Sequence, residues 1–106
     1  MTIYNEVWGK RLKEARLKSG LSQKQLGIQA GLDPSVASTR INRYELGIHK
    51  ADYQIAQHLA RVLAVPTAYF YADDDEIAKW ILLHSQLSQA QRDRIYATLQ
   101  ENNEQR

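Results

Sequence analysis

Four polar side chains stand close together near the middle of the chain, at Ser38, Thr39, Asn42 and Arg43. Ser38 and Asn42 are four positions apart, as are Thr39 and Arg43, so a helix presents all of them on one side. Arginine can bond to guanine O6 and N7, asparagine can pair with adenine, and a threonine methyl group can touch thymine. These residue types at this spacing favour the reading of base edges in DNA.

Residues suited to catalysis are few. The sequence has no cysteine, and its three histidines are His49, His58 and His84. No spacing brings a nucleophile together with a base or with a set of metal ligands. The acidic run from Asp73 to Glu76 lacks the alternating ligands of a calcium loop, and favourable charge at a helix N-terminus explains it better. We therefore expect no enzymatic activity, no catalytic residue, no metal and no cofactor.

Residues 20–47 predict two short helices joined by a tight turn, which is the pattern of a helix-turn-helix. The first helix is expected over 23–30. Ser22 and Gln25 have capping-box spacing at its start, and Gly31 supplies a left-handed residue at its end.

The second helix of this pair, the recognition helix, is expected to begin with Asp33 as its N-cap and Pro34 in its first turn. Its inward sector consists of Val36, Ala37, Ile41 and Tyr44. The four polar residues named above occupy the opposite sector, with Ser35 and Arg40 at the edges. The sequence therefore predicts a helix with a buried side and a base-reading side.

The rest of the chain is also helical in pattern, and no strand pattern occurs. Further helices are expected over 5–18, 52–64, 67–71, 74–86 and a last stretch capped by Ser88. The expected fold is all-α, with a five-helix DNA-binding domain over residues 1–72 and a two-helix C-terminal extension over 73–106.

The helix expected over 74–86 is unusually apolar, because it has hydrophobic residues on more than one side. Such a helix needs more than one partner. We predict that this extension forms a dimer surface, composed of Trp80, Ile81, Leu83 and Leu87. The alternative is that the two tail helices only cover the core of their own domain.

Composition and charge agree with a DNA-binding domain. The 106 residues are 43% hydrophobic and 25% charged, which suits one ordinary globular domain with an extension. Residues 1–61 hold ten Lys and Arg against five Asp and Glu, whereas residues 62–106 hold four against seven. The basic half therefore contains the helix-turn-helix, as contact with phosphates requires. No membrane span or signal peptide is recognisable, so we expect a protein of a microbial cytoplasm without a membrane partner.

Five sequence features follow one another in a distinctive order: GKRLKEAR, GLSQKQLG, the turn glycine Gly31, INRYE before Gly47, and QHLARVLAVP before an aromatic pair. On these features the chain resembles the Cro/repressor family of helix-turn-helix regulators, also called the xenobiotic response element family, over about Val7 to Tyr71. The resemblance implies a lambda-repressor-like domain in which five helices surround one core and the third enters the major groove.

The resemblance also implies contacts for other residues. The expected phosphate contacts are Ser22, Gln23, Lys24, Arg40 and Lys50, because helix starts and the loop after the recognition helix meet the DNA backbone. For Ser22, capping alone is an equal alternative, and for Arg40 the alternatives are an intramolecular ion pair and, less favoured, base reading. Arg16 and Glu45 occupy positions that form an ion pair in the family pattern, joining the first helix to the end of the recognition helix.

The sequence departs from the family pattern at three places. About four extra residues lie between Gly31 and Glu45, close to one helical turn, and we expect them to lengthen the recognition helix. Gly27 stands where alanine is usual, which permits closer packing of two helices. Ala51 and Ala64 stand where proline and glycine are common, so the loop and the helix end at these positions are expected to differ.

Together these features predict a sequence-specific regulator of transcription that binds double-stranded DNA. A repressor that binds a palindromic operator as a homodimer is the leading hypothesis. One alternative is an antitoxin-like protein that binds a partner toxin and regulates its own gene. Another is an adaptor that binds a protein partner and has lost specific DNA recognition.

Overall fold

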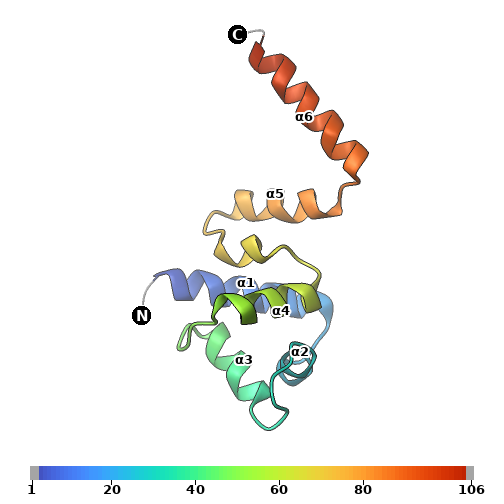
Figure 1. The fold of residues 1–106 in the computed structure, drawn as a ribbon. Helices are drawn as coiled ribbons and strands as arrows, with labels where there is room; N and C mark the ends of the chain where they lie inside the picture. Colours follow the sequence, from blue (N-terminus) through green and yellow to red (C-terminus); the bar gives the residue numbers. More distant parts are fainter. Residues whose placement is uncertain (1–2, 105–106) are drawn as a thin grey trace.

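The computed structural model describes residues 3–104, which form seven helical elements (Figure 1). In chain order they are α1 (Ile3–Ser19), α2 (Gln23–Gln29), α3 (Ala37–Glu45), α4 (Tyr53–Leu63), the 3₁₀ helix η1 (Thr67–Tyr71), α5 (Asp75–Gln86) and α6 (Gln89–Glu104). The all-α prediction is confirmed, since residues 3–104 contain no strand. None of the helices in this range is long and apolar enough to cross a membrane.

A single apolar core joins the first five elements. Its fully buried side chains are Leu12 of α1, Leu26 of α2, Ile41 of α3, Leu59 of α4 and Phe70 of η1. Burial of each such side chain contributes about 1.5–3 kcal/mol relative to an exposed position. Because each comes from a different element, the core fixes how the five elements pack. The short helix predicted over 67–71 is confirmed, and it closes this core.

Polar caps begin several helices at the predicted positions. In α2 the Ser22 hydroxyl accepts from the Gln25 backbone N–H at 3.0 Å, and the Gln25 side chain accepts from the Ser22 N–H at 2.8 Å. Asp52 and Asp74 cap α4 and α5 through their carboxylates. A second capping box, headed by Ser88, begins α6. These are local interactions, so the helix starts could be predicted from short sequence patterns.

The predicted start of the recognition helix is wrong, because α3 begins at Ala37 rather than at Pro34. Asp33 instead closes a turn, in which its carboxylate accepts from the Ser35 backbone N–H at 2.8 Å and from the Ser35 hydroxyl at 2.6 Å. These bonds lower the pKa of Asp33 and compete with helix formation. Val36, predicted to point inward, is 40% exposed. The extra residues therefore lengthen the turn and not the helix.

Two glycines let α3 approach its neighbours closely. A Cβ atom on Gly27 of α2 would lie 2.7 Å from the Ala37 Cβ and 3.0 Å from the Ala37 carbonyl oxygen. A Cβ on Gly9 of α1 would lie 2.7 Å from the Tyr44 carbonyl oxygen and would overlap that of Glu45. Glycine costs about 1 kcal/mol inside a helix. Here that cost permits contacts at both ends of α3 that a larger residue would prevent.

Arg11 fastens the start of α5 to α1. Its side chain is 4% exposed, and its guanidinium donates to the Ala72 carbonyl at 2.8 Å and to the Asp75 carboxylate at 2.9 Å. Burial by itself would lower the pKa of Arg11, but Asp75 and Glu14 outweigh it and the pKa is raised. The hydrogen bond from Arg11 also lowers the pKa of Asp75. This contact holds the tail against the domain at one defined point.

The helix α5 packs on the domain through one side only. Ala78 is buried, and Ile81 and Leu82 pack partly buried against the core. Ile81 was expected at a dimer surface; it lies one turn from Ala78 and so points to the same inner side. Ile77 and Trp80 remain 53% and 61% exposed on the outer side.

The last helix points away from the domain. Within residues 89–104 no side chain of α6 is buried, and Figure 1 shows α6 extending from the end of α5 into open space. The radius of gyration is 16.3 Å, against about 13 Å for a compact chain of this length. The chain is therefore compact from α1 to α5, and α6 extends beyond this compact part.

Replacement of Ala64 tests a strained helix end. Ala64 has φ 56°, in the left-handed region that favours glycine. We expect Ala64→Gly to raise the free energy of unfolding by about 1 kcal/mol, measured by urea denaturation, because the Cβ strain is removed. Gly31→Ala is the reciprocal change, since Gly31 has φ 93° and a Cβ there meets no atom within 4 Å. It should lower stability; a loss of stability in Ala64→Gly would contradict the interpretation.

Candidate nucleic-acid interface

The outer side of α3 carries the side chains predicted to read bases. Ser38, Thr39, Asn42 and Arg43 are all exposed, while Ile41 anchors the opposite side in the core. The helices α2 and α3 lie together at the end of the molecule opposite α5 and α6 (Figure 1). A polar helix face presented in this way fits the major groove, which is about 12 Å wide.

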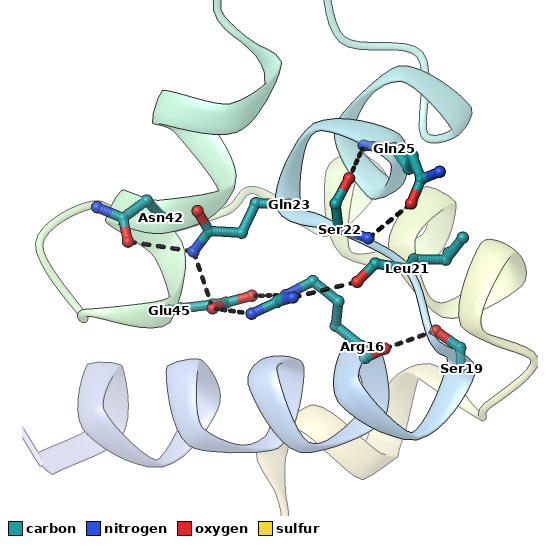
Figure 2. A network of polar contacts seen from close by, with 8 residues as sticks. All are labelled: Arg16, Ser19, Leu21, Ser22, Gln23, Gln25, Asn42 and Glu45. Atoms are coloured by element: carbon teal, nitrogen blue, oxygen red, sulfur yellow. Dashed lines mark hydrogen bonds and ion pairs between the residues drawn. The ribbon is translucent and has the colours of Figure 1, made fainter.

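An ion pair behind α3 fixes its position (Figure 2). The Arg16 guanidinium of α1 donates to both carboxylate oxygens of Glu45, at 2.6 Å and 3.1 Å, and also to the Leu21 carbonyl at 3.1 Å. The two side chains are 11% and 3% exposed. The paired geometry fixes direction as well as distance, because a guanidinium binds a carboxylate through two parallel hydrogen bonds.

Gln23 joins the ion pair to the side of α3 predicted to read bases (Figure 2). Its amide Nε2 donates to Glu45 Oε1 at 3.1 Å and to Asn42 Oδ1 at 3.1 Å. Both amide protons are thus used within the protein. Gln23 bonds only to the carbonyl oxygen of the Asn42 side chain. The NH₂ group of Asn42 therefore remains able to donate outward. Spacing along the chain does not predict this bridge, because Gln23 and Asn42 belong to different helices.

Arg40 of α3 lies against the aromatic ring of Tyr44, one turn further along the same helix. Its guanidinium donates to the Tyr44 hydroxyl at 2.9 Å and stacks 5.9 Å from the centre of the same ring. The remaining N–H groups are not used by this contact, since a guanidinium has five. Arg40 is therefore held in one direction while keeping donors for an anion.

The other residues predicted to bind phosphate are exposed at two places beside α3. Ser22 and Lys24 lie at the start of α2, which the Gln23 bridge brings to the side of α3. Lys50 lies in the loop that follows α3. The Ser22 hydroxyl caps α2 as an acceptor, so its own proton remains available. Capping and phosphate binding are therefore compatible at Ser22.

The region that contains this geometry is similar in sequence and structure to known proteins. A family model described as Helix-turn-helix, of the Cro/C1 type, matches residues 12–70, which is more than half of the chain. The chain belongs to the Cro/C1-type helix-turn-helix family. A solved structure described as "Crystal structure of transcriptional regulator BswR" is similar to this helix-turn-helix protein, with a TM-score of 0.83 and 41% sequence identity. The match covers 88% of this chain and 92% of that chain. A comparison with curated proteins finds no match.

Membership confirms the resemblance drawn from the five sequence features. The helix-turn-helix protein belongs to a class of DNA-binding regulators of transcription and not to a class of enzymes. Residues 12–70 include α2, α3, α4, the C-terminal part of α1 and most of η1. The match to BswR covers 88% of the chain, which is more than residues 1–72 could supply, so it includes part of the tail.

Glu45→Gln tests whether the ion pair holds α3. The change keeps the shape of the side chain but leaves the buried guanidinium of Arg16 without a counter-charge. We expect a loss of about 3 kcal/mol in the free energy of unfolding, measured by urea denaturation. Glu101→Gln, the same chemical change at an exposed position of α6, is the matched control and should leave stability unchanged. Equal stability of the two variants would show that the pair does not hold α3.

Proposed function

We propose that this protein is a transcriptional repressor that binds a palindromic operator as a homodimer and acts on DNA in the cytoplasm. The observation that carries the proposal is the exposed polar face of α3, which α1 and α2 hold from behind through Glu45. A face that is already ordered before binding pays little conformational entropy on contact with DNA.

Base reading is assigned to Ser38, Thr39, Asn42 and Arg43. Arg43 is exposed and can reach guanine O6 and N7 with two hydrogen bonds. Asn42, oriented by Gln23, can donate to adenine N7, and its oxygen has a second lone pair for the adenine amino group. Ser38 and Thr39 precede these residues by one turn and would contact the neighbouring base pairs.

Phosphate contacts are assigned to residues around this face. Lys24 and Lys50 supply charge from either side, Ser22 supplies its hydroxyl proton, and Arg40 supplies the N–H groups that Tyr44 leaves free. Such contacts set position and salt dependence but carry no sequence information. Gln23 has a different proposed role from the one expected at first, because both its amide protons are bonded within the protein.

Dimerisation is assigned to the tail. Residues 1–72 would form the DNA-binding unit and residues 73–106 the dimerising unit, with Trp80, Leu83 and Leu87 at the contact. A two-fold axis would place the two copies of α3 about one DNA turn apart, roughly 34 Å. Ile81 is left out of this surface because it packs on the core of its own chain.

Selection of binding sites from a random duplex DNA library tests the proposed function directly. At near-physiological salt, we expect enrichment of an inverted repeat with half-sites about one helical turn apart. The inverted repeat follows from a symmetric dimer that presents two copies of α3. Binding that depends on salt alone, with no enriched sequence, would contradict the proposal.

On the selected operator, substitutions should separate the two kinds of contact. Arg43→Ala should weaken binding about 10- to 100-fold and relax the preference at one position in each half-site. Lys50→Ala should weaken binding to all sequences alike and reduce the salt slope by about one per protomer. Lys13→Ala is the control, since it removes the same charge from an exposed position of α1.

A double-mutant cycle tests the role of Gln23. If Gln23 orients Asn42, then Gln23→Ala weakens operator binding in the parent protein but has little further effect in Asn42→Ala. Titrations of labelled operator and of unrelated DNA measure both effects. If Gln23 instead binds phosphate directly, the two losses add, and binding to unrelated DNA falls as well.

A further inference from the structure

The tail carries two apolar surfaces that its own chain leaves open. We define the α5 face as Ile77, Trp80 and Leu83, and the α6 face as Ile95, Tyr96 and Leu99. Each of these side chains is between 44% and 68% exposed. Large apolar side chains gathered on one surface mark interaction sites in soluble proteins. No side chain of α6 is buried within residues 89–104. Because helices in proteins gain most of their stability from packing one face, α6 favours a partner surface.

The joint between α5 and α6 keeps the two faces apart within one chain. Arg92 of α6 donates to the Leu87 carbonyl at 2.7 Å and to the His84 carbonyl at 3.3 Å, and also to the Gln89 side chain at 3.0 Å. These bonds satisfy the last carbonyl groups of α5, which the helix itself leaves without partners. They hold α6 pointing away from the domain (Figure 1), so the α6 face does not fold back on the α5 face beside it.

We infer that the α6 face of one copy packs on the α5 face of a second copy, which returns the same contact with its own α6. This reciprocal exchange of C-terminal arms rests on the homodimer proposed above and specifies its interface. A two-fold axis closes the exchange, so no surface remains open for further copies.

Charge on the two faces is mixed and does not by itself select an arrangement. Asp75, Glu76 and Lys79 border Trp80 and Leu83 on α5, and Asp75 is already bonded to Arg11. Arg94 borders Ile95 and Leu99 on α6, while Arg92 and Asp93 border Tyr96. What favours the exchange over a contact between two like faces is that it covers both apolar faces of both copies.

Area and length agree with the exchange. Six large apolar side chains, each about half exposed, offer roughly 600 Å² at one contact, and two contacts offer roughly 1,200 Å², the lower end for stable interfaces. The 16 residues of α6 span about 24 Å. At this length α6 can lie along the whole α5 of a second copy, whose 12 residues span about 18 Å.

Cysteine crosslinking tests the exchange, because the chain has no cysteine of its own. Leu83→Cys and Leu99→Cys, each in the full chain, are mixed, left to exchange subunits and oxidised. The exchange predicts a disulfide between residue 83 of one copy and residue 99 of the other, identified by mass spectrometry of linked peptides. Lys13→Cys on α1, mixed with Leu99→Cys, is the control and should give no such link.

Other crosslinks overturn the inference. Disulfides formed by Leu83→Cys alone would indicate α5 on α5, and those formed by Leu99→Cys alone would indicate α6 on α6. Mass measured by light scattering without DNA gives an independent test: Leu99→Asp should be monomeric, while Ala97→Asp, on the other side of α6, should remain dimeric. A dimeric Leu99→Asp protein overturns the exchange alone. A monomeric parent protein overturns both the exchange and the homodimer of the proposed function.

Discussion

The buried carboxylate of Glu45 is the group on which the arrangement of α1, α2 and α3 depends; we call this part of the molecule the reading end. It accepts hydrogen bonds from Arg16 of α1 and Gln23 of α2, so it joins three helices at one point. A buried charge that loses its partner is costly, on the order of 3–5 kcal/mol. The three helices therefore keep one relative placement, and the outer side of α3, the proposed base-reading face, is held as a nearly rigid surface.

The backbone contacts around α3 support the same placement. Gly27 and Gly9 allow α2 and α1 to approach the two ends of α3 so closely that a Cβ atom would not fit. The turn closed by Asp33 and Ser35 sets where α3 begins. Polar pairing thus sets the direction of α3, while close packing sets its distance from its neighbours, and neither restraint replaces the other.

The two ends of the molecule have different requirements. The reading end is complete within one chain, because its core and its ion pair need no other copy. The tail is fastened to the domain by Arg11 and Asp75, yet it leaves apolar side chains of both α5 and α6 open to solvent. Apolar surface gathered in this way marks an interaction site, and it is the surface that the proposed dimer would cover.

Local sequence determined the helices of this protein, several of their caps, the left-handed Gly31 and the polar side of the recognition helix. These features arise from hydrogen bonds and side-chain contacts within about four residues, which short patterns record. The tertiary structure decided that α3 starts at Ala37, that Ile81 points into the core and that Gln23 meets Asn42. Each of these depends on which helices pack together, and that is set by burial of residues far apart in the chain, which no local pattern contains.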